Sequence, residues 1–242
     1  MFRKIIATLA IPAAIAAVAC ISTAASAAVD PHVAYSTNEA GYQNPQSGWR
    51  FRDVQASTYL RTITQNADVH PGVHLANPSN GDEVAEALTW NGTTYTPIVS
   101  INGETSDPFA SDLVISAHDT VRFEIYYSTS SHWVTFRITD QTSGTERTAN
   151  LRYGYALWYS AGAGVQDTRT LGAAGTTVLA AFTKVTETSY NGTHGSLSGR
   201  WNAQEVVATA NGGPPSSGNV ETILPGSLGT GFKVSEGAVS SS

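Results

Sequence analysis

The segment Thr120-Val-Arg-Phe-Glu-Ile-Tyr-Tyr-Ser-Thr-Ser-Ser-His-Trp-Val-Thr-Phe-Arg-Ile-Thr139 decides the fold class. Apolar residues alternate with more polar ones over 121–128 and again over 133–138, and a Thr-Ser-Ser turn separates the two runs. Successive side chains of a β-strand point to opposite faces, so period-two alternation is typical of half-buried antiparallel strands. The segment therefore predicts a β-hairpin with one face in a core.

Similar short runs, separated by turn residues, follow one another along most of the chain. Asn91-Gly92 and Asn191-Gly192 favour tight turns because both residue types tolerate a positive φ. No segment beyond the N-terminus has a helical period. Many short strands without helices predict an all-β fold, a two-sheet antiparallel β-sandwich. Besides the hairpin, the expected strands are 51–60, 72–75, 84–90, 94–101, 113–116, 146–151, 155–158, 177–188 and 200–208, with one or two more between 220 and 234.

The N-terminus has the pattern of a secretory signal peptide. Arg3 and Lys4 precede an apolar run, and Ala25-Ser-Ala27 provides a small-residue exit. Cleavage after Ala27 predicts a secreted, extracellular protein. Cys20 sits in a segment that half resembles a lipoprotein box, so a lipid-anchored product is the alternative. The apolar run is too rich in Ala to favour a transmembrane span.

The rest of the chain is expected to form one domain. Residues 1–27 are the signal peptide, 28–210 the sandwich, 211–219 a loop rich in Gly, Pro and Ser, and 220–242 terminal strands with a frayed tail. Cys20 is the only cysteine, so the mature chain has no disulfide and no Cys metal ligand. A chain of this length can rely on its core alone, since larger domains bury a larger fraction of their surface.

Charge and motifs exclude several classes of function. Without the signal peptide, 11 basic residues face 19 acidic ones, a net charge of −8. This balance argues against nucleic acids and anionic membranes as partners. No cofactor or metal motif is present. His70 and His74 have ligand-like spacing, but Pro71 opposes a helix, and on a strand the two lie about 13 Å apart. They are expected to be loop or surface residues.

The order of segments resembles the eqolisins, the glutamic peptidases. The resemblance spans most of residues 38–190 and implies two bent sheets of the concanavalin A-like kind. Each motif is weak by itself, and the shared order carries the similarity. The similar segments are Asn38-Glu-Ala-Gly-Tyr42, Phe51-Arg-Asp-Val-Gln-Ala-Ser-Thr58, Gly72-Val-His-Leu75, Val84-Ala-Glu-Ala-Leu-Thr-Trp90, Thr94-Tyr-Thr-Pro-Ile-Val-Ser-Ile101, Leu113-Val-Ile-Ser-Ala-His-Asp-Thr-Val121, Thr139-Asp-Gln-Thr-Ser-Gly144 and Leu179-Ala-Ala-Phe-Thr-Lys-Val185.

The resemblance also implies an altered catalytic pair. Eqolisins use a Gln and a Glu on neighbouring strands, where the Glu transfers protons and the Gln holds water and stabilises the oxyanion. In this alignment the Gln position falls on Glu86 and the Glu position on Ser100. Ser cannot accept the proton, which leaves Glu86, with Glu104 as a displaced partner, as the candidate catalytic residues.

Three functions follow as hypotheses. The first is a secreted, non-catalytic protein that binds glycan or peptide on its concave sheet through Trp90, Tyr95, Ser100 and Trp133. The alternative is an acid-active glutamic-type endopeptidase with a rearranged pair. The second alternative is a structural protein of the cell envelope. Ligand identity and oligomeric state have no signal in the sequence.

Overall fold

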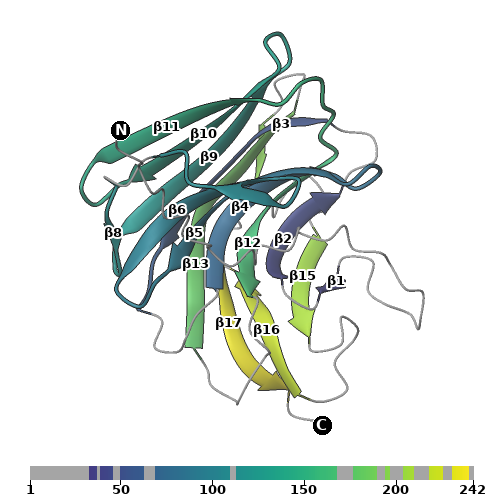
Figure 1. The fold of residues 1–242 in the computed structure, drawn as a ribbon. Helices are drawn as coiled ribbons and strands as arrows, with labels where there is room; N and C mark the ends of the chain where they lie inside the picture. The colour runs from purple at the N-terminus through teal and green to yellow at the C-terminus, as the bar shows by residue number, and fades with distance from the viewer. Residues whose placement is uncertain are drawn as a thin grey trace, which may run out of the picture.

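The computed structural model describes residues 33–36, 39–45, 50–62, 69–109, 113–167, 177–189, 194–196, 204–209, 218–225 and 231–239 (Figure 1). Several sequence-based expectations lie outside these residues. They are the signal peptide with Cys20, the turn at 191–192, residues 211–217 of the expected loop, and the tail at 240–242.

In the described part of the chain, the regular elements are strands and none is a helix. Consequently no described segment forms a helix that would cross a bilayer. The strands are β1 (Val33–Ser36), β2 (Glu39–Pro45), β3 (Phe51–Tyr59), β4 (Val69–Asn77), β5 (Asp82–Trp90), β6 (Thr94–Ile101), β7 (Glu104–Ser106), β8 (Ile115–Ser116), β9 (Thr120–Ser128), β10 (Trp133–Asp140), β11 (Thr145–Arg152), β12 (Ser160–Asp167), β13 (Thr177–Ser189), β14 (His194–Ser196), β15 (Gln204–Thr209), β16 (Gly218–Pro225) and β17 (Phe232–Val239).

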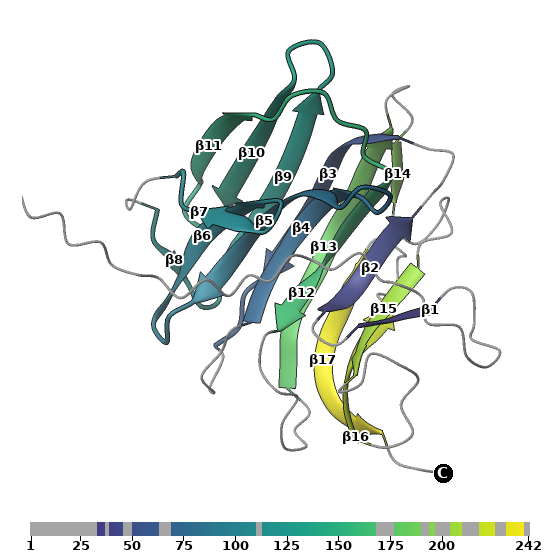
Figure 2. The ribbon, with the colours of Figure 1, turned by 45° about the vertical axis from the view of Figure 1, so that its right-hand side comes forward.

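The strands form two antiparallel layers that are joined at one side. The first layer has the order β6-β5-β4-β12-β2-β15, and the second has the order β17-β13-β3-β9-β10-β11. β16 pairs with both β15 and β17 and so connects the layers by hydrogen bonds. β1 adds to β15 as a parallel strand. Figure 2 shows the continuous, bent sheet that results.

The core lies between the layers. The alternation in β9 and β10 sends every second residue inward, and the inward residues Phe123, Tyr127, Phe136 and Ile138 are fully buried. Burial of each such side chain stabilises the fold by about 1.5–3 kcal/mol. The first layer contributes smaller residues, among them Ala163 on β12. The two-sheet sandwich expected from the sequence is confirmed.

The expected strands match the structure unevenly. The hairpin is confirmed as β9 and β10, and Gly92 has a φ of 94° in the turn between β5 and β6. The strand expected at 155–158 is wrong, since only Trp158 makes a bridge there, to Phe51. The strand is instead Ser160–Asp167, and the chain also has an early strand, Glu39–Pro45, that the sequence did not predict. The strand at 160–167 is rich in Gly and Ala, and the strand at 39–45 contains Gly, Asn and Pro, residues that carry little strand signal.

Candidate functional site

Polar side chains gather on the outer face of the first layer. Cross-strand partners point to the same face, and the register pairs Gln166 with both Glu39 and His70, and Gly162 with His74. Their chain neighbours Ala40, Val73, Ala161 and Val165 point into the core. Glu39, His70, His74 and Gln166 are therefore outward-facing, yet each is at most 9% exposed. They share one buried polar environment outside the core.

Glycines form the floor of this environment. A Cβ on Gly41 would lie 2.4 Å from the backbone oxygen of Ala163, and a Cβ on Gly164 would lie 2.6 Å from that of Ala40. Neither position has room for a side chain without movement of the backbone. A Cβ on Gly162 would instead meet the ring of His74, at 2.5 Å from Cε1. The three glycines thus let β2 and β12 approach closely and let the His74 ring lie over the sheet.

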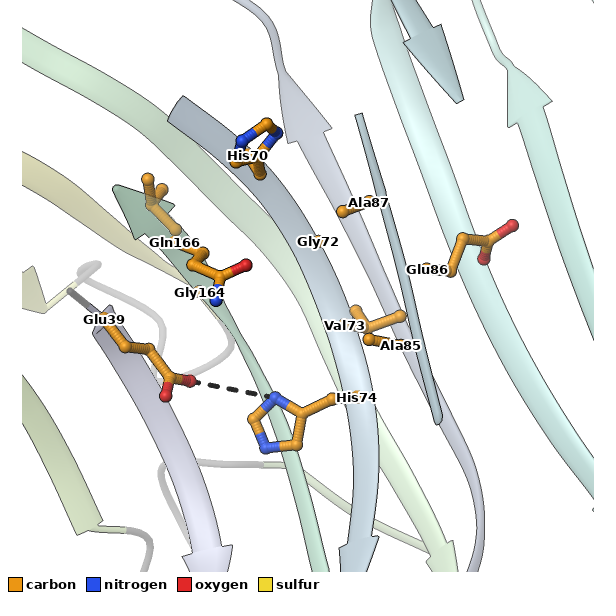
Figure 3. Close-up of a pocket in the computed structure, with 11 residues that line it drawn as sticks. Glu39, His70, Gly72, Val73, His74, Ala85, Glu86, Ala87, Gly164 and Gln166 are labelled. Carbon is orange, nitrogen blue, oxygen red and sulfur yellow. Dashed lines mark ion pairs between the residues drawn. The ribbon is translucent and has the colours of Figure 1, made fainter. Parts of the chain in front are cut away.

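A small pocket of about 40 Å³ opens here (Figure 3). It has room for roughly three water molecules. Figure 3 shows Glu39 and Gln166 on one side and the two histidines of β4 on the other. The lining residues are Glu39, His70, Gly72, Val73, His74, Ala85, Glu86, Ala87, Gly164, Val165 and Gln166.

Glu39 and His74 face each other across the pocket. Glu39 Oε1 lies 3.8 Å from His74 Nδ1, the contact drawn in Figure 3. Burial raises the pKa of Glu39 to about 7 and lowers the pKa of His74 to about 4, because it removes water from both charged forms. An ion pair would shift both pKa values the other way, so desolvation outweighs pairing. Near neutral pH the imidazole is uncharged and the carboxyl group is close to half protonated.

This arrangement supplies hydrogen-bonding and proton-transfer groups. A carboxyl group with a pKa near neutrality can both donate and accept a proton. The neutral imidazole and the Gln166 amide each offer a donor and an acceptor. Within the described ranges, no group of three or more His, Cys, Asp or Glu residues is arranged to hold a metal ion.

The structure separates the two residues that the alignment had paired. Glu86 lies on the same face of β5 as the core residues Val84 and Leu88. Its side chain therefore points between the layers, away from His74 in Figure 3. It is fully buried, and Oε2 accepts a hydrogen bond of 3.1 Å from the backbone N–H of Glu124. Burial raises the pKa of Glu86 well above its ordinary value. Ser100 pairs with Ala85, so it faces the opposite side of the layer.

The other candidates from the sequence are dispersed. Trp90 and Tyr95 are in contact in the core, with ring centroids 4.7 Å apart and planes tilted by 48°, and the Tyr95 hydroxyl donates to the backbone oxygen of Arg61. Glu104 is exposed on β7, at the edge of the first layer. Trp133 is 41% exposed where β10 begins, in the second layer. None of the four lines the pocket.

Of the residues that line the pocket, the sequence analysis named only Glu86 as a candidate, and it missed the polar residues whose side chains face the pocket. His70 and His74 lie on a strand and are buried, so the expectation of loop or surface histidines is wrong. Their shared face was correctly anticipated for a strand. Glu39 and Gln166 were missed because their strands were missed. The available signal is the alternation Ala161-Gly162-Ala163-Gly164-Val165, in which larger residues face the core and glycines face outward.

Comparison with solved structures identifies the fold. A scytalido-glutamic peptidase bound to a transition-state analogue inhibitor matches with a TM-score of 0.61 and 16% identity, over 85% of this chain and 100% of that one. The chain has an eqolisin-like fold. A second eqolisin, SCP-B in complex with the tripeptide Ala-Ile-His, matches with a TM-score of 0.58 and 15% identity, over the same shares of the two chains.

The resemblance proposed from the order of segments is thus confirmed at the level of the fold. Sequence comparison adds nothing to it, because no family model and no curated protein matches the chain. At this level of identity the eqolisin-like fold does not determine the chemistry. The side chains on the outer face of the first layer bear on the function more directly than the fold does.

Proposed function

We propose that this protein is an extracellular binding protein that holds an extended polypeptide on the outer face of the first layer. The observation that carries the proposal is the set of buried polar side chains, Glu39, His74 and Gln166, above a glycine floor. Glycines let another backbone come close to the sheet, and the side chains beside them can pair with its amide groups. The signal-peptide pattern supports an extracellular location.

A polypeptide suits this pocket better than a glycan does. Sugar rings commonly stack on aromatic faces, and the pocket lining contains no Trp, Tyr or Phe. The solved eqolisins support the same preference, because one was determined with a peptide-based transition-state analogue and another with a tripeptide. Those ligands belong to the related structures, and here they support only the class of ligand.

The test measures the binding of short unstructured peptides to the purified protein, with fluorescence anisotropy as the readout. His74→Gln keeps a polar side chain but changes its shape, and we expect it to weaken binding at least about tenfold, equivalent to roughly 1.4 kcal/mol. Thr135→Ala, on the outer face of β10, is the matched control and should bind like the wild type. Equal binding by all three proteins, or binding of glycans alone, would refute the proposal.

One observation favours a second candidate, a glutamic-type peptidase whose base would ionise near neutral pH rather than in acid. Glu39 and Gln166 are cross-strand partners that line one pocket, and the pKa of Glu39 is raised to about 7. Ionised Glu39 would take a proton from a water molecule as the oxygen of that water bonds to the peptide carbon. The Gln166 amide would donate a hydrogen bond to the oxyanion. The proton would then pass to the leaving amine as the C–N bond breaks.

The two candidates differ in turnover. Mass spectrometry of a protein substrate incubated with the wild type, with Glu39→Gln and with Glu86→Gln decides between them. The peptidase predicts cleavage that Glu39→Gln abolishes and Glu86→Gln retains. Binding without cleavage at any pH supports the binding protein.

A further inference from the structure

The two layers differ sharply in the charges that their strands carry. The six strands of the first layer contain no Lys or Arg, and the six strands of the second contain both signs. The acidic residues of the first layer are Glu39, Asp82, Glu83, Glu86, Asp167 and Glu205. The basic residues of the second are Arg52, Arg122, Arg137, Arg147, Arg152, Lys184 and Lys233, and its acidic ones are Asp53, Glu124, Asp140, Glu146, Glu187 and Glu236.

In the second layer, opposite charges lie in pairs both along a strand and across neighbouring strands. Glu124 Oε2 lies 3.2 Å from Arg122 Nη2 and 3.1 Å from Arg137 Nη1, and Arg137 also contacts Glu146. The outer face of that layer therefore balances its own charges. The first layer has no strand-borne Lys or Arg that could do the same.

Two of the first-layer carboxyl groups belong to its outer face. Glu39 lines the pocket. Glu83 pairs with Ala76, which is two residues after His74 on β4 and so lies on the same face of the layer. Ala85 and Ala87 lie beside them and are partly exposed, so this part of the face is open to a ligand. In a partly buried setting, opposite charges attract more strongly than in bulk water. A cationic side chain would meet carboxyl groups here and no positive charge from any first-layer strand.

We propose that the ligand of the first layer is a basic polypeptide, with a Lys or Arg side chain paired to Glu39. This inference rests on the proposed function and narrows its ligand class. An anionic polypeptide is disfavoured at the same place, because it would bring like charges together in a site with little water. The Lys or Arg stem would lie over Gly164 and Ala87, while its charged end reaches Glu39.

Three matched peptides test the inference. They share one Gly/Ala background and differ only in carrying Lys, Gln or Glu at alternate positions. The wild-type protein should bind the Lys peptide at least about tenfold more tightly than the Gln peptide at low salt, and the preference should shrink at high salt. The Glu peptide should bind most weakly.

Two variants locate the effect. Glu39→Gln should bring the ratio of the two affinities, Lys peptide over Gln peptide, close to one, whether or not it also weakens binding of the Gln peptide. Glu83→Gln should reduce the preference less, and it serves as the second probe if Glu39→Gln folds poorly. Glu146→Gln removes the same charge from the second layer and should leave the preference for the Lys peptide unchanged.

The outcomes separate the two proposals. Equal affinity for the Lys and Gln peptides overturns the basic-ligand inference and leaves polypeptide binding in place. A Lys preference that Glu146→Gln abolishes also overturns it, because the charge would then act from the other layer. Failure to bind any of the three peptides overturns the proposed function as well.

Discussion

The first and second layers of the sandwich are both antiparallel, but they differ in composition. The inward face of the second layer is built from large side chains such as Phe123 and Phe136, and its outward face from paired charges. The first layer has small residues in β2 and β12, and its outward face has buried polar groups and carboxyl groups. We infer that the second layer mainly stabilises the fold. The first layer buries smaller side chains and presents the outward face that binds a ligand.

The largest expected contrast lies in the core. Phe136→Ala should lower the free energy of unfolding by roughly 3–5 kcal/mol, because it removes a fully buried ring from the second layer. Ala163→Gly, at a buried position in the first layer, should cost only about 1 kcal/mol. Urea unfolding measures both. Similar losses at the two positions would remove the contrast in packing.

The glycine floor should be sensitive to added volume. Gly164→Ala places a Cβ against the backbone oxygen of Ala40 and should destabilise the protein by roughly 1–3 kcal/mol. Gly162→Ala meets the His74 ring at 2.5 Å, which can move, and the backbone oxygen of Tyr42 at 2.9 Å, a less severe contact than the 2.6 Å at Gly164, so it should cost less stability but weaken peptide binding. Thermal melts and binding assays on both variants test this separation. A milder effect of Gly164→Ala on stability would contradict it.

The buried carboxyl group of Glu39 should make stability depend on pH. Its pKa is about 7 in the folded state against an ordinary 4.5, so its contribution is complete below about pH 4.5 and is lost as the pH rises through about 7. Glu39→Gln should therefore gain roughly 1–3 kcal/mol relative to the wild type as the pH rises from 5 to 8. Thermal melts across this pH range measure the difference.

His74 provides the opposite control for that measurement. Its pKa is lowered to about 4 from 6.5, so its contribution is present above about pH 6.5 and is lost as the pH falls towards 4. The wild type should lose stability as the pH falls from about 6.5 towards 4, and His74→Gln should lose less over the same range. A stability difference from the wild type that does not vary with pH, for both variants, would show that the two groups are not buried as described.

The smallest effect is expected on the outer face of the second layer. Arg137→Gln removes contacts with Glu124 and Glu146, but the arginine side chain is 38% exposed. Such ion pairs contribute at most about 1 kcal/mol and weaken with salt. Chemical unfolding at low and high salt checks this. A large loss, or any loss of peptide binding, would assign to the second layer a role that we reserve for the first.

The sequence predicts the second layer better than the first for a physical reason. Alternation of large apolar and polar residues, as in β9 and β10, reveals both the strand and its buried face. In β12, Gly and Ala stand where such residues would be, so the period is present but has little amplitude. The pocket depends on that strand and on β2, and its residues are far apart in sequence. Only the register brings Glu39, His74 and Gln166 together.

The position of the ligand is tested most directly by NMR, with a Lys-containing peptide titrated into isotope-labelled protein. Glycine amides resonate in a distinct region of the spectrum and so report on the floor of the pocket. We predict that the largest shifts occur at Gly41, Gly72, Gly162 and Gly164, with little change along β9 to β11. Shifts confined to the outer face of β9 to β11, around Glu124 and Arg137, would contradict the assignment of binding to the first layer.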